Sequence, residues 1–368
     1  MTHSTQILKY LFLSDENACP FAHLSIQEDV SSLIDFAQRN KCLHVLFHFT
    51  KCTRCRQMIG NGAYQKLMKL QLVALSRASV IAEERTRLIS MASNIRSRIV
   101  FYKQSPVQTP HTTLKVSNDI DVLTSESIQQ QLCSMYADAG YVAKVHAPKE
   151  VSLHSPSNFS SIDLHTLVAY PHYGNVRDSR HQMIARFSRE LYTNARKDTR
   201  TGVYVSDACT HLIFLVLYFW YNDLGFGIQT LYVFLSTIST LSDHELTALE
   251  ALTRDYKIHR LFSFIVHTSH MFFEREIPRS IAKKFRLSIF QSCLSHLFID
   301  NFIVTRLLIR DWDPRDQKIR NLYRKYYLFD LILDENLSPL RLLRLRILRL
   351  YISAFASRFC RIQCLRDE

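Results

Sequence analysis

Three aspartates have the spacing that a site for divalent metal requires. Asp119 and Asp121 stand one residue apart, and Asp163 follows later in the chain. Residues i and i+2 of a strand project from the same face, so Asp119 and Asp121 are expected to point the same way. Two carboxylates this close raise each other's pKa unless a cation lies between them.

Divalent magnesium would suit such a group of carboxylates. Mg²⁺ prefers oxygen ligands and commonly takes one or two carboxylates together with substrate phosphates. If Asp163 lies on a strand beside the first pair, the three carboxylates complete a site for two ions about 3.5–4 Å apart. One ion would activate an attacking hydroxyl, and the other would hold a triphosphate and its leaving pyrophosphate. The alternative is a set of ordinary surface aspartates, because Asp-x-Asp is a frequent pattern.

The elements that must position these aspartates follow from the hydrophobic period. Short apolar runs predict five strands, at 99–102, 120–123, 142–146, 151–154 and 161–168. Between Ser125 and Ala139 the apolar spacing is helical, and Gly140 follows where a left-handed C-terminal cap is needed. This order predicts a small mixed sheet with one crossover helix.

Helical spacing dominates the rest of the chain. A long helix is predicted within the stretch after Ala63, which contains neither Gly nor Pro up to Ser105. Later helices are predicted at 207–221, 228–238, 243–252 and 258–273. The predicted fold class is therefore α+β, with a small mixed β-sheet core flanked by large helical regions. The predicted regions are an N-terminal helical region at 1–96, the core sheet at 97–174, and a C-terminal helical region at 175–368 with an Arg/Leu-rich terminal helix.

The composition is that of a basic globular protein. Hydrophobic residues make up 47% of the chain and charged residues 21%, which excludes a disordered or low-complexity protein. The net charge of +13 favours nucleic acid, nucleotides or an anionic membrane surface as partners, without separating them. Nine cysteines without a cleavable signal sequence favour a reducing cytoplasm. The longest apolar run, 212–221, is shorter than the roughly 20 residues of a membrane span, so no span is expected.

The segment 98–170 resembles the nucleotidyltransferase superfamily of the DNA polymerase β type. That superfamily has a Gly-Ser turn, an Asp-x-Asp pair and a third acid on a later strand. More narrowly, the segment resembles an uncharacterised bacterial nucleotidyltransferase family with a Leu-Lys-Gly element, a basic residue four before Asp-Ile-Asp, and a later Asp-Leu-His. Lys103 matches the lysine of that element, Lys115 matches the basic residue, and the pair at 140–141 matches a Gly-Tyr after the helix. Gln104 stands where the family has glycine.

The resemblance implies a metal-dependent nucleotidyltransferase. Such an enzyme moves a nucleoside monophosphate from an NTP, bound with Mg²⁺ or Mn²⁺, to an acceptor hydroxyl or similar group. Asp119 and Asp121 would bind metal, and Asp163 would bind the catalytic ion and help to deprotonate the acceptor.

The resemblance also implies a set of phosphate contacts. Lys103, Gln104 and Ser105 would contact the triphosphate, and Lys115 would offset its charge. The acceptor stays open among RNA, including a tRNA end, a protein side chain and a small molecule, and the oligomeric state is equally open. The alternative is a catalytically reduced protein of the same fold that binds nucleotide or RNA or acts as a scaffold. Gln104 keeps this alternative in play, because glycine lets the backbone approach phosphate closely.

Four other residues have the spacing of metal ligands: His44, His48, Cys52 and Cys55. Zinc is one interpretation. On a single helix, however, the four would spread over about 16 Å, too far for one tetrahedral ion. We therefore favour packing side chains or free thiols.

Further histidines and arginines each have two interpretations. His165 follows Asp163 by two residues and should share its face, where it either orients that carboxylate or the acceptor, or is a structural histidine. The pairs His267/His270 and Cys360/Cys364 are expected to be side chains without chemistry. The Arg/Leu-rich tail at 339–365 either binds RNA or docks its leucines on the protein, and docking is favoured.

Overall fold

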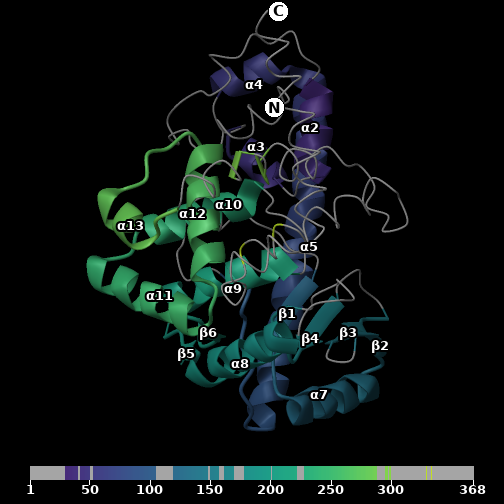
Figure 1. Cartoon of the computed structure of the whole chain (residues 1–368). Coiled ribbons are helices and arrows are strands. Elements are labelled where there is room, and N and C mark those ends of the chain that lie inside the picture. The colour runs from purple at the N-terminus through teal and green to yellow at the C-terminus, as the bar shows by residue number, and fades with distance from the viewer. Residues whose placement is uncertain are drawn as a thin grey trace, which may run out of the picture.

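The computed structural model describes residues 30–39, 42–49, 53–104, 119–147, 150–156, 161–169, 178–199, 201–221 and 228–287, together with single positions at 295, 296, 298, 299, 329 and 333. Among the described residues, four helices come first: α2 (Val30–Arg39), α3 (Leu43–Phe49), α4 (Thr53–Ile59) and the long α5 (Asn61–Asn94). A small mixed sheet follows, and then a second series of helices (Figure 1). The predicted α+β class is confirmed at this level.

The sheet has four strands in the order β1-β4-β3-β2. Its members are β1 (Asp119–Leu123), β2 (Val142–Ala147), β3 (Glu150–His154) and β4 (Ser161–His165). β1 runs parallel to β4, whereas β3 is antiparallel to both of its neighbours. The predicted mixed sheet is therefore present, with β4 ending at His165, earlier than the apolar run up to Val168 suggested.

The crossover helix α7 (Glu126–Asp138) lies between β1 and β2, as the apolar spacing predicted. Its start is fixed by Ser125, whose hydroxyl accepts a hydrogen bond from the backbone N–H of Ile128. Its end is followed by Gly140 at a φ of 83°, a conformation that glycine adopts without steric cost. The sequence predicted the role of Gly140, whereas it gave Ser125 only as the start of the helical spacing.

The strand predicted at 99–102 is reduced to a bridge at one residue. Val100 pairs on one side with Leu123 of β1 and on the other with Tyr204. The chain then turns at once, and the backbone N–H of Gln104 donates to the carbonyl of Phe101. The early turn ends the pairing before a full strand forms, so the predicted strand is wrong in length although right in place.

Alternation along the strands gives the sheet one apolar and one polar face. The buried side chains of the apolar face are Ile120, Val122, Leu153, Ile162 and Leu164. They pack against α5 and α7 through residues that include Leu88 and Leu132. The polar face is thereby left to the residues between them in the sequence, which include all three predicted aspartates.

Helices also follow the sheet: α8 (Asp178–Asn194), α9 (Ala208–Tyr221), α10 (Ile228–Ser239), α11 (Asp243–Asp255), α12 (His259–Phe272) and α13 (Arg279–Lys284). The four helices predicted at 207–273 are confirmed as α9 to α12. A short hairpin of β5 (Arg196–Lys197) and β6 (Tyr204–Val205) was not predicted, because strands of two residues leave no periodic signal. Among the described helices, none is long and apolar enough to cross a membrane.

The long helix α5 connects two packing clusters (Figure 1). Leu67, near its beginning, belongs to a large cluster that joins α2 and α3 to α9, α10 and α12. Leu88 and Ala92, near its end, belong to the smaller cluster under the sheet. The packing therefore cuts across the three predicted regions, because the first helices share a core with the last ones.

Several predicted groups lie outside the described part of the chain. They are the side chains of His44, His48 and Cys55, residue Cys52, and the tail at 339–365 with its two cysteines. His267 and His270 are described on α12. His267 Nε2 lies 3.0 Å from the carbonyl oxygen of Phe285, and burial lowers the pKa of both imidazoles, as expected for structural histidines.

A buried glutamate of α5 forms a hydrogen bond with a residue that follows α7. Glu84 is 3% exposed and accepts a hydrogen bond of 2.6 Å from the hydroxyl of Tyr141, while Arg87 contacts both groups. Replacing Glu84 by alanine leaves a buried hydroxyl without its acceptor, so we expect the free energy of unfolding to fall by about 1–3 kcal/mol. Urea denaturation measures this. The matched control is Glu83→Ala at the exposed neighbouring position, which should change stability by no more than about 0.5 kcal/mol.

Candidate metal centre

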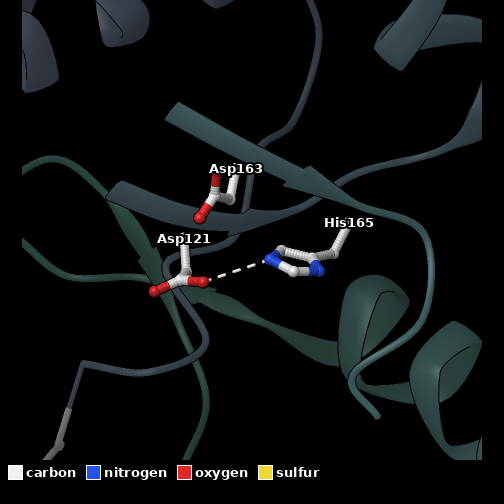
Figure 2. A group of neighbouring side chains, drawn as sticks. All are labelled: Asp121, Asp163 and His165. Atoms are coloured by element: carbon white, nitrogen blue, oxygen red, sulfur yellow. Dashed lines mark hydrogen bonds and ion pairs between the residues drawn. The ribbon is translucent and has the colours of Figure 1, made fainter. Parts of the chain in front are cut away.

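Parallel pairing of β1 and β4 places Asp121 directly beside Asp163. His165 lies two residues further along β4 on the same face. Asp121, Asp163 and His165 each offer one ligand atom, and these atoms all lie within 4.8 Å of one another (Figure 2). Two of the three predicted aspartates are therefore brought together, with an imidazole as the third member of the group.

Asp119 is on the polar face but outside this close group. It begins β1 and projects from the same side as Asp121. Its negative charge is near enough to contribute to raising the pKa of Asp163. In the part of the chain that the structure describes, His165 thus takes the place that the sequence assigned to Asp119.

Two side chains contact the same carboxylate oxygen of Asp121. Lys103 Nζ donates to Asp121 Oδ1 at 2.6 Å. His165 Nε2 lies 3.1 Å from the same oxygen, the contact drawn as a dashed line in Figure 2. The Asp121 side chain is only 7% exposed. Burial alone would raise the pKa of this carboxyl, but the hydrogen bond with His165 and the ammonium of Lys103 outweigh burial and lower the pKa to about 2. The lowered pKa keeps Asp121 an anion, and its Oδ1 accepts from Nε2 when the imidazole hydrogen resides on that nitrogen.

Asp163 is the least satisfied member of the group. Its Oδ1 is buried and has no hydrogen-bond partner among the described residues. Burial raises the pKa of Asp163, and the carboxylates of Asp121 and Asp119 raise it further, against a hydrogen bond from Ser152. A buried oxygen without a partner costs free energy, and a cation at this position would remove that cost. The donor set thus fits a divalent ion.

Lys103 contacts one member of the group directly. The resemblance assigned its ammonium to a triphosphate, whereas in the structure the ammonium contacts Asp121 and lies 4.5 Å from the centre of the Tyr218 ring. Burial would lower the pKa of Lys103, but Asp121 and Tyr218 outweigh burial and raise it. A permanent positive charge therefore faces the carboxylates.

Gln104 also has a protein partner. Its side-chain oxygen accepts a hydrogen bond of 2.5 Å from Arg85 of α5, whose guanidinium lies 4.4 Å from the centre of the Phe101 ring. Its amide nitrogen remains the group with which it would donate to a phosphate. The other two predicted phosphate contacts, Ser105 and Lys115, lie outside the described residues.

Sequence reasoning missed two aromatic residues near the group. Tyr102 is fully buried, with its ring edge-on to His165 at 5.5 Å and to Phe214 of α9 at 5.1 Å. Tyr218, also on α9, supports Lys103. Both tyrosines lie in apolar runs, where nothing distinguishes them from ordinary core residues.

Glu150 was also missed as a neighbour of the group. It pairs with His165 in the β3–β4 register, and its Oε2 lies 3.8 Å from His165 Nδ1. Strand alternation places it on the polar face, so this signal was available once the register of β3 and β4 was known. The polar face thus holds a fourth carboxylate behind the imidazole.

Comparisons of this chain with protein-family models, with curated proteins and with solved structures found no match. The interpretation of the site therefore rests on its side chains.

Removing the ammonium of Lys103 tests how far Asp121 depends on it. Lys103→Met keeps the aliphatic length but leaves the buried carboxylate with His165 alone. We expect the metal-free protein to lose about 1–3 kcal/mol of unfolding free energy, measured by urea denaturation in the presence of a chelator. Lys144→Met on the exposed edge strand β2 is the control and should behave like the wild type. Equal stability of all three proteins would show that the ion pair contributes nothing.

Proposed function

We propose that this protein is a metal-dependent nucleotidyltransferase that moves a nucleoside monophosphate from an NTP to an acceptor hydroxyl or similar group. The observation that carries the proposal is the pairing of Asp121 with Asp163 on parallel strands, with a buried oxygen of Asp163 left without a hydrogen-bond partner. The resemblance of residues 98–170 to nucleotidyltransferases provides the reaction type.

Each of these residues of the polar face would have its own role in the proposed reaction. Asp121 and Asp163 would hold a Mg²⁺ or Mn²⁺ ion, and Asp119 adds negative charge on the same face. When bound, the ion would neutralise phosphate charge and lower the pKa of the acceptor hydroxyl. Lys103 places a second positive charge beside Asp121, where it stabilises charge that develops on a phosphate.

A second candidate is a protein that binds nucleotide without transferring it. Two groups expected at the phosphates are already engaged within the protein, because Lys103 contacts Asp121 and the side-chain oxygen of Gln104 accepts from Arg85. A site that holds an NTP through metal, but lacks a close backbone approach to the phosphates, would bind without catalysis.

Transfer of label from each α-labelled NTP, with Mg²⁺ or Mn²⁺ and with cell RNA or protein as acceptor, tests the proposal. We expect the wild type to transfer label, and Asp121→Asn or Asp163→Asn to lose activity by about 100-fold or more, because each removes negative charge from the metal site. The matched control Asp138→Asn changes an exposed aspartate at the end of α7 and should retain activity.

The outcomes separate the two candidates. NTP binding that requires metal and the two aspartates, without transfer to any acceptor, would favour the binding protein. Neither transfer nor NTP binding by the wild type would contradict both.

A further inference from the structure

His165 lies between two carboxylates, one at each nitrogen of its ring. Nε2 is 3.1 Å from Asp121 Oδ1, and Nδ1 is 3.8 Å from Glu150 Oε2. The imidazole is almost completely buried, and the ring of Tyr102 meets it edge-on. The ring is thus held with one nitrogen toward the metal-ligand carboxylates and the other toward a separate carboxylate.

This arrangement matches the requirements of a metal-bound histidine. A neutral imidazole has one N–H donor and one acceptor nitrogen, and only the acceptor can bind a metal ion. Metal-binding histidines usually donate their other N–H to a carboxylate or carbonyl, which fixes both the tautomer and the ring orientation. If the hydrogen resides on Nδ1, it faces Glu150, and Nε2 presents its lone pair to an ion beside Asp121 and Asp163.

We infer that His165 Nε2 is a metal ligand, that Glu150 positions its ring, and that the site prefers a first-row transition metal such as Mn²⁺ over Mg²⁺. The inference rests on the metal site of the proposed function but not on the transfer reaction. Mg²⁺ favours oxygen ligands and gives up its water reluctantly, whereas transition metal ions accept imidazole as well as carboxylate. The purely carboxylate site expected from the sequence would lack this preference.

The register of the sheet makes Glu150 the residue suited to this role. β3 runs antiparallel to β4, and Glu150 is the direct partner of His165, so backbone hydrogen bonding fixes the separation of the two side chains. The Glu150 side chain is 22% exposed. A small rotation of this carboxylate would therefore bring it within hydrogen-bond distance of Nδ1. Because Glu150 acts through His165, it is a positioning residue.

A bound ion must also compete with Lys103. The ammonium donates to the same oxygen, Asp121 Oδ1, that faces the ligand group. The ring of Tyr218, whose centre lies 4.5 Å from Lys103 Nζ, offers the ammonium a favourable contact when it leaves that oxygen. Lys103→Met should therefore bind Mn²⁺ more tightly than the wild type does.

Calorimetric titration of the full chain with Mn²⁺ alone and with Mg²⁺ alone tests the preference. We expect the wild type to bind Mn²⁺ at least about tenfold more tightly than Mg²⁺. His165→Ala should lose about 10–100-fold in Mn²⁺ affinity and also lose the preference, because oxygen ligands alone remain. His181→Ala, at an exposed position of α8, is the control and should bind both ions like the wild type.

Pulsed electron paramagnetic resonance of bound Mn²⁺ separates a ligand from a merely structural histidine. Coupling to an imidazole nitrogen should be present in the wild type and absent in His165→Ala. Glu150→Gln should keep the nitrogen coupling but lose about tenfold in Mn²⁺ affinity, whereas Glu83→Gln should lose nothing. His165→Gln provides a second variant if the alanine variant does not fold, as judged by circular dichroism.

Two results would overturn the inference: equal affinity of the wild type for both ions, or bound Mn²⁺ without nitrogen coupling. Unchanged Mn²⁺ affinity in Glu150→Gln would overturn the role of Glu150. These measurements contain no nucleotide. A chain that shows the nitrogen coupling but transfers no label would thus keep this inference and lose the proposed function, and a chain that transfers label without the coupling would do the reverse.

Discussion

A buried carboxylate must be neutralised or hydrogen-bonded, and the arrangement around Asp121 satisfies this constraint with parts of the chain far apart in sequence. Lys103 comes from the turn that follows Val100, and His165 comes from the end of β4. Tyr218 supports the lysine from α9, within the second series of helices. The charge of one aspartate therefore links the sheet, the turn before it and a helix after it. Any change in the position of β1 would separate Asp121 from all of these partners at once.

The sheet can hold this group of carboxylates because one of its faces packs against helices and the other carries polar residues. The apolar face packs on α5 and α7, and this packing helps to hold β1 beside β4. The polar face is then free to carry residues that destabilise the fold when left uncompensated, such as the buried and unpartnered oxygen of Asp163. The apolar face contributes packing, and the polar face carries the grouped carboxylates.

Local patterns predicted the elements, whereas pairing between distant strands decided the site. The apolar spacing located α7, with Gly140 after its end, and it located the strands that hold Asp121 and Asp163, because each of these signals lies within a few residues. The replacement of Asp119 by His165 in the close group could not be predicted, since it depends on the register of β1 and β4. The contact of Lys103 with Tyr218 depends on the course of the chain over more than a hundred residues, and its contact with Asp121 joins residues on either side of a loop. The spacing of hydrophobic residues along the chain contains no information about such contacts.

The site is rich in carboxylates, although the chain as a whole is basic. The protein carries a net charge of +13, yet Asp119, Asp121 and Asp163 share one face of the sheet, where the ammonium of Lys103 contacts Asp121. A basic chain attracts anions such as nucleotides over long distances, but this face would repel a triphosphate at short range. A divalent ion between the two anionic groups resolves the conflict, because it is attracted by the carboxylates and in turn binds phosphate oxygens. In the proposed function, a bound metal ion is therefore what would let this acidic face accept an anionic substrate.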